Sequence, residues 1–301
     1  MSSTRTVYEV THTTIYSGTE PVTVGHNQAW LCPRDLPWQK RLRHRLQITP
    51  EPSSRTERFD YFENIVSQFS FNQGYDELTV TSISLIEIMS HATLPMNYSP
   101  RWEEIRDRLR TDRCYPWLPA LEYTFDSPRV RLSSALKDYG DPSFISGRMI
   151  FELLADLLSR IKDDFEFNAT ATTVSTPLEE VLRNRRGVCQ DFAHLTIGVL
   201  RSWGLAARYV SGYLRTYPAP GQPRLQGADA SHAWVSVYCG EELGWVDIDP
   251  TNNLFPNDEH ITVAWGRDYG DVTPLRGVFI GGGAHRLRVG VDVEPIETIP
   301  C

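Results

Sequence analysis

Residues 185–194 read Arg-Arg-Gly-Val-Cys-Gln-Asp-Phe-Ala-His. This stretch passes from a turn signal at Gly187 into an apolar pattern typical of a helix, which places Cys189 at a predicted helix start. The helix is expected to continue to Trp203 and to close at Gly204. A thiol at a helix start faces unpaired backbone N–H groups, which favour its thiolate form. Cys189 is therefore the first candidate for a nucleophile.

Two further helices are predicted upstream of Cys189. Thr176-Pro177-Leu178-Glu179 is a capping-box sequence with proline at the first helical position. It predicts a short helix that ends near Gly187, where the glycine suits a left-handed cap. Apolar residues over 150–161 recur at i, i+3, i+4, i+7, i+8 and i+11, which predicts an amphipathic helix packed on a core.

Downstream of the thiol, two predicted strands carry a histidine and two aspartates. His232 and Trp234 share one face of the first strand, and Asp247 and Asp249 share one face at the end of the second. A histidine beside the thiol can take its proton, and a carboxylate on the other ring nitrogen sets the tautomer and stabilises the imidazolium. The three residue types in this order predict a site for nucleophilic acyl transfer.

The first third of the chain is rich in β-branched and aromatic residues in alternation with polar ones. Predicted strands cover residues 7–16, 22–31, 43–48, 59–66 and 78–88, separated by Pro, Gly, Asn and Ser. Several short strands at this spacing predict a β-sandwich.

These patterns together predict an α+β fold with two domains. An N-terminal β-sandwich is expected over residues 1–95, and a papain-like core over residues 96–301, in which the nucleophile helix packs on an antiparallel sheet. Residues 278–293 contain Gly281-Gly282-Gly283 and an alternation of Leu and Val, which predicts a turn and a half-buried strand. This tail is assigned to the core as its C-terminal strands.

Composition narrows the class of partner. The net charge of −8 argues against a nucleic-acid partner, because phosphate binding needs a basic surface. No apolar stretch is long enough to span a bilayer and no apolar signal core stands at the N-terminus, so no membrane partner is expected. The glycine run is not followed by Gly-Lys-Ser/Thr, and no His-Glu-x-x-His is present, so we expect no cofactor and no metal.

The five cysteines lie far apart and include no Cys-x-x-Cys pair. Neither a zinc ribbon nor a redox dithiol is therefore indicated. So few cysteines in a chain of 301 residues make a disulfide framework improbable and favour a cytoplasmic location.

Several segments of the chain resemble the transglutaminase-like cysteine enzyme superfamily over residues 165–260. They are Gly187-x-Cys189, Gly204-x-x-Ala207-Arg208-Tyr209-Val210-x-Gly212-Tyr213, His232-Ala233-Trp234-Val235 and Trp245-x-x-x-Asp249-Pro250-Thr251. The upstream strand region and Asp271-Val272-Thr273-Pro274-x-Arg276-Gly277-Val278 resemble the bacterial branch with an N-terminal β domain, whose members are described as candidate cysteine proteases.

The resemblance implies Cys189 as nucleophile, His232 as general base and acid, and Asp249 as the orienting carboxylate. Asp249 is preferred because it matches the Asp-Pro-Thr element, and Asp247 stays the second candidate. Gln190 stands where animal transglutaminases carry an aromatic residue, which leaves their substrate specificity in doubt here.

Three other residues near these motifs have more than one interpretation. Trp234 either shields the site from water or packs in the core. His194 is expected to be a hydrogen-bonded structural histidine rather than a second base, and Arg208 to make a structural ion pair.

The implied reaction is attack by the thiol on an amide carbonyl to give a thioester. We expect a peptide or protein substrate and hydrolysis by a peptidase or amidase. A primary amine as acceptor would instead give a protein-glutamine transamidase. A non-catalytic binding scaffold is the third possibility, and the oligomeric state is unknown.

Overall fold

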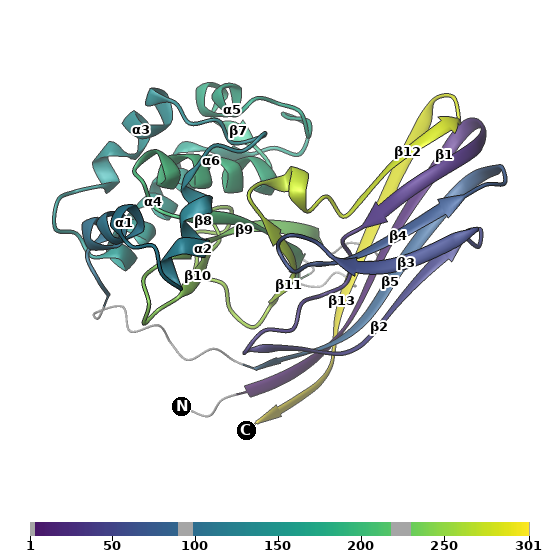
Figure 1. The fold of residues 1–301 in the computed structure, drawn as a ribbon, viewed down its shortest axis with the longest axis horizontal. Helices are drawn as coiled ribbons and strands as arrows, with labels where there is room; N and C mark the ends of the chain where they lie inside the picture. Colours follow the sequence, from purple (N-terminus) through teal and green to yellow (C-terminus); the bar gives the residue numbers. More distant parts are fainter. Residues whose placement is uncertain (1–3, 90–98, 218–229, 301) are drawn as a thin grey trace.

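The computed structural model describes residues 4–89, 99–217 and 230–300. Figure 1 shows two parts: an elongated, strand-rich domain and a compact group of helices around a small sheet. The predicted combination of an N-terminal strand-rich region with a mixed helical and β core is confirmed. Among the described residues there is no helix with the length and apolar character that crossing a bilayer requires.

The strand-rich domain is one seven-stranded antiparallel sheet organised by its longest strand, β1. The first part of β1 lies between β5 and β13, and its last part lies between β4 and β12. Side chains from both parts, including Leu46, Phe69 and Val80, pack in one hydrophobic cluster. A β-sandwich has two sheets that pack face to face, whereas here β1 joins all the strands by hydrogen bonds into one sheet. The strands are β1 (Thr4–Ala29), β2 (Gln39–Thr49), β3 (Ser54–Phe59), β4 (Ile65–Phe71), β5 (Tyr75–Met89), β12 (Leu275–Gly281) and β13 (His285–Pro300).

The structure corrects two predictions about strands. The C-terminal strands β12 and β13 pair with β1 and so belong to the N-terminal sheet, not to the core. A half-buried strand pattern does not name its partner, which is why the sequence misassigned them. The predicted strand over residues 59–66 is interrupted: β3 ends at Phe59, β4 begins at Ile65, and residues 60–64 form a turn. In this turn the Asp60 carboxylate accepts hydrogen bonds from the backbone N–H groups of Phe62 and Asn64.

The core contains a four-stranded antiparallel sheet in the order β10-β9-β8-β11. The strands are β8 (Ala207–Leu214), β9 (Ala230–Tyr238), β10 (Trp245–Ile248) and β11 (His260–Gly266). The helices are α1 (Trp102–Thr111), α2 (Trp117–Leu121), α3 (Ser134–Gly140), α4 (Ile150–Asp164), α5 (Leu178–Asn184) and α6 (Cys189–Ser202). Helix α6 packs on β8 and β9 (Figure 1). The helices predicted over residues 150–161 and from Cys189 are confirmed as α4 and α6.

The two domains meet along β11, an edge strand of the core sheet. The Gln39 side chain of β2 donates to the backbone oxygen of Thr262 at 2.7 Å and accepts from its N–H at 2.8 Å. Asn64 makes the same kind of pair with the backbone of Trp265. These side chains supply backbone partners that a further strand would otherwise give, so the strand-rich domain covers this edge.

Candidate functional site

The turn that precedes Cys189 follows directly from the end of α5. That helix ends at Asn184, and Arg185 takes the left-handed conformation with φ 55°. The predicted left-handed cap at Gly187 is therefore wrong, and so is Thr176 as the capping residue, because Pro177 is the N-cap. Residues 186–187 instead form the short parallel strand β7 (Arg186–Gly187) with β6 (Glu166–Phe167).

Asp191 fixes the backbone around Cys189. Its Oδ2 accepts hydrogen bonds from the Val188 N–H at 2.9 Å and from the Thr172 hydroxyl at 2.6 Å. Gly187 leaves room for this carboxylate, since a Cβ at residue 187 would lie 2.7 Å from the same oxygen. The sequence prediction did not use Asp191. Its position in the first turn of a helix, three residues beyond the N-cap, was the available signal.

Cys189 is the first residue of α6 and is partly buried. Its backbone N–H has no acceptor within the helix because of its place in the first turn. The other cysteines that the structure describes are Cys32, Cys114 and Cys239, and all four thiols are free. Burial raises the pKa of Cys32 to about 11, which disfavours its thiolate.

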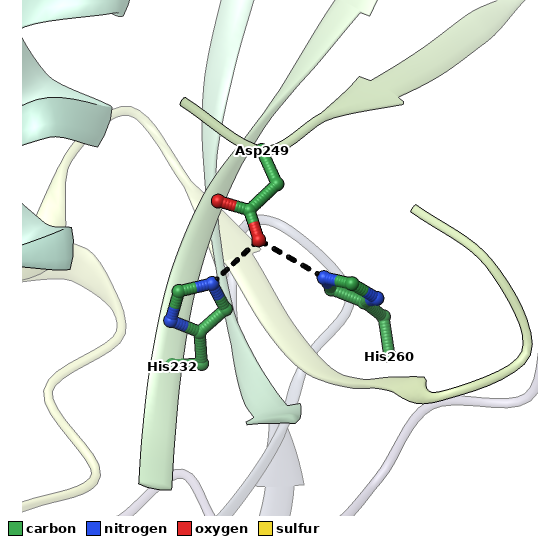
Figure 2. Close-up of side chains that lie close together, drawn as sticks. All are labelled: His232, Asp249 and His260. Atoms are coloured by element: carbon green, nitrogen blue, oxygen red, sulfur yellow. Dashed lines mark hydrogen bonds and ion pairs between the residues drawn. The ribbon is translucent and has the colours of Figure 1, made fainter. Parts of the chain in front are cut away.

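Asp249 lies directly against His232. His232 is carried by β9, and its Nε2 lies 2.8 Å from Oδ2 of Asp249, which follows β10 (Figure 2). The other carboxylate oxygen, Oδ1, accepts the backbone N–H groups of Thr251 at 2.9 Å and of Asn252 at 3.2 Å. The Asn252 side chain donates to Oδ2 at 2.7 Å. The Asp249 side chain is fully buried, and every one of these contacts donates to it.

A second histidine contacts the same carboxylate. Nε2 of His260 lies 3.1 Å from Oδ2 of Asp249, on the other side from His232 (Figure 2). His260 and Asn252 were not predicted from the sequence. His260 begins β11, a strand that the sequence did not predict, and no local pattern links it to Asp249, which lies 11 residues away in the chain.

The electrostatics favour a charged pair on Asp249. Burial alone would raise the pKa of Asp249, but hydrogen bonds from His232 and His260 outweigh it and hold that pKa well below its usual range. Burial alone would lower the pKa of His232, but hydrogen bonds with Asp249 and Cys189, together with their negative charge, raise it to about 10. His232 therefore interacts with both Cys189 and Asp249, and both interactions favour its protonated form.

The other residues singled out from the sequence lie around this pair. Asp247 accepts a hydrogen bond from Trp234 Nε1 at 2.9 Å, so it is Asp249 that contacts His232. The Trp234 ring is fully buried, with its centroid 6.0 Å from that of His232. It lies over Gly212, where a Cβ would come within 2.4 Å of the indole. Trp234 thus both packs in the core and lines the buried side of the histidine.

Three further residues have roles in packing or helix structure. Gln190 is partly buried in the first turn of α6. His194 is buried, accepts a hydrogen bond from the Tyr269 N–H at 3.1 Å, and has a pKa lowered to about 4 by burial. In the part of the chain that the structure describes, Arg208 has no ion-pair partner. It lies instead between the rings of Trp245 and Trp265, at 4.2 Å and 3.6 Å.

Among the described residues, His232, Asp249 and His260 form a group that could hold a metal ion. Each offers one possible ligand atom, and these three atoms lie within 4.8 Å of one another. The hydrogen bonds just described account for this spacing without a metal ion.

Two families match the chain. Residues 8–87 match the bacterial transglutaminase-like N-terminal region, and residues 148–250 match the transglutaminase-like superfamily. The chain belongs to the transglutaminase-like superfamily. The second match contains Cys189, His232 and Asp249, and the first lies within the strand-rich domain.

Similar proteins cover nearly the whole length of the chain. An uncharacterized protein of Mycobacterium tuberculosis is 40% identical over 297 residues, which cover 96% of this chain and 93% of that protein. An uncharacterized protein of Mycobacterium leprae is 33% identical over 94% of this chain and 97% of its own length. A candidate cysteine protease from Cytophaga hutchinsonii shares the fold, with a TM-score of 0.75 at 17% identity over 97% of this chain and 91% of that chain.

Proposed function

We propose that the protein is a cysteine-dependent acyl-transfer enzyme that acts on amide bonds. Cys189 is the nucleophile, His232 the general base and acid, and Asp249 the carboxylate that orients His232. The observation that carries the proposal is the buried His232, which interacts with both Cys189 and Asp249 and whose pKa those contacts raise to about 10. Such a histidine holds a proton opposite a thiolate at neutral pH.

The reaction follows from these positions. The Cys189 sulfur attacks the amide carbonyl, and the oxyanion that develops is met by the Cys189 backbone N–H at the start of α6. His232 gives its proton to the leaving amine as the C–N bond breaks, which leaves a thioester on Cys189. His232 then takes a proton from the acceptor as the acceptor attacks the thioester. The C–S bond breaks, which releases the acyl product and returns the Cys189 sulfur as an anion opposite the protonated His232. Asp249 stabilises the imidazolium throughout and is not itself protonated.

The acceptor decides the reaction type. With water the products are an acid and an amine, and we propose this hydrolysis of a peptide or protein substrate as the main activity. The two-domain layout shared with the candidate cysteine protease supports it. A second candidate is transamidation. A protein-glutamine gamma-glutamyltransferase of Pseudomonas aeruginosa is 33% identical over 109 residues, which cover 35% of this chain and 16% of that protein.

The deciding experiment offers the purified protein a mixed peptide pool together with a labelled primary amine. Mass spectrometry follows cleaved peptides, released ammonia and the labelled product, with Cys189→Ala as the matched control. Cleavage that disappears in Cys189→Ala supports hydrolysis. Incorporation of the amine without cleavage would establish transamidation instead. A protein that does neither, and whose Cys189 gains no acyl mass, is a binding scaffold.

We propose a cytoplasmic location because the four described cysteines are free thiols, which suits a reducing compartment. Cell fractionation tests this, and recovery of the protein outside the cytoplasm would contradict it.

A further inference from the structure

His260 is a buried histidine that has no role in the proposed reaction. It is the first residue of β11 and is 4% exposed. Its Nε2 lies 3.1 Å from Oδ2 of Asp249, the oxygen that also contacts His232 (Figure 2). An ionised carboxylate can only accept hydrogen bonds, so the proton on His260 must sit on Nε2, which donates.

The His260 ring contacts Asn257 and Trp234, and its Nδ1 lies 3.4 Å from Oδ1 of Asn257. The Trp234 ring meets it in a T-shaped arrangement at 5.3 Å. The strand that carries it is held from the other domain by Gln39, whose amide pairs with the backbone of Thr262. A donor anchored in this way can define the direction of the group that accepts from it.

The accepting group is the Asp249 carboxylate, and His260 is one of three donors on Oδ2. The others are His232 at 2.8 Å and Asn252 at 2.7 Å. Backbone N–H groups occupy Oδ1, so the carboxylate is held against rotation with Oδ2 facing His232. Without His260, one of the contacts that direct Oδ2 is lost and a void opens beside it.

We propose that His260 is a positioning residue that holds the Asp249 carboxylate in the orientation in which it stabilises the His232 imidazolium opposite the Cys189 thiolate. The inference rests on the proposed function, since it concerns the same site. The titratable groups that face this cluster come from several elements. They are Cys189 of α6, His232 of β9, Asp249 after β10, and His260 of β11, with Asp247 of β10 bound to the adjacent Trp234 indole.

The test measures alkylation of Cys189 by iodoacetamide as a function of pH, which needs no substrate. The pH range over which His232 keeps its proton is the window in which it can hold this ion pair with Cys189. In His260→Phe, which keeps a ring but removes the donor, we expect this window to end at a lower pH. The alkylation rate at pH 7 should fall about tenfold, the effect of losing one hydrogen bond to a charged group. His260→Gln retains an N–H donor and should recover most of the rate.

His12→Gln is the matched control, because His12 is equally buried and hydrogen-bonded but lies in β1, where it contacts Tyr213 and Thr14. It should leave both limbs of the profile unchanged. His260→Ala serves as a second donor-free variant, and circular dichroism shows which variants are folded.

Three results would overturn the inference: a rate lowered equally at every pH with unshifted limbs, a widened window, or equal losses in His260→Phe and His260→Gln. A wild-type Cys189 that reacts no faster than an ordinary thiol would instead refute the proposed function itself. The two failures are therefore distinguishable.

Discussion

Replacing Asp249 by asparagine should leave the nucleophile and its histidine in place but reverse the hydrogen bond between residue 249 and His232. The backbone N–H groups of Thr251 and Asn252 both point at Oδ1, so the asparagine must keep its oxygen there. Its NH₂ group then takes the position of Oδ2 and donates to Nε2 of His232. The proton of a neutral His232 is forced onto Nδ1, the wrong nitrogen for accepting a proton from Cys189.

The size of the effect follows from the charge that is removed. The pKa of His232 should fall from about 10 toward its ordinary value of 6.5, because burial lowers it and only Cys189 remains to raise it. That drop corresponds to roughly 5 kcal/mol, at about 1.4 kcal/mol for each tenfold change in the protonation equilibrium. Since Cys189 shares in raising the pKa, this is an upper limit. We expect a loss of about 10³ to 10⁴ in the rate of acyl transfer.

The assay is the pH profile of iodoacetamide alkylation, followed by turnover once a substrate is found. In Asp249→Asn the alkylation rate at pH 6 should fall to that of an ordinary thiol, because His232 no longer holds a proton opposite the sulfur. Asp247→Asn is the matched control, because Asp247 accepts from Trp234 and does not contact His232. An Asp249→Asn protein that is folded and retains reactivity within about tenfold at pH 6 would refute the reasoning, as would an equal effect of Asp247→Asn.

Three further predictions concern stability. Gly187→Ala places a Cβ 2.7 Å from Asp191 Oδ2 and should cost about 1–3 kcal/mol, measured by denaturant unfolding; an unchanged midpoint would contradict it. Gly212→Ala places a Cβ 2.4 Å from the Trp234 ring and should destabilise the folded protein at least as much as Gly187→Ala does. It should also change the near-ultraviolet circular dichroism of tryptophan, because the indole must move; an unchanged spectrum would contradict this. The stability lost in His232→Gln should be largest below pH 6.5 and shrink as pH rises through about 10, because the raised pKa of His232 stabilises the folded state only while the ring is protonated; a loss independent of pH would argue against the charged pair.

Local sequence patterns were sufficient for the parts of the site that depend on neighbouring residues. The apolar period after Cys189 predicted α6, and the strand patterns predicted β9, which carries His232, and β10, which ends just before Asp249. The resemblance to the superfamily then favoured Asp249 over Asp247, and the structure brings Asp249 to His232. Helix and strand periods are local properties, which is why these assignments needed no knowledge of distant contacts.

The sequence by itself therefore determined the strand-rich N-terminal region, the helices α4 and α6, and the residue types of the site. Only the tertiary structure decided that β12 and β13 pair with β1, and that His260 shares the carboxylate of Asp249. The physical reason is the same in both cases. A strand edge or a carboxylate oxygen accepts any suitable hydrogen-bond partner that the fold brings within about 3 Å, and no local pattern names that partner.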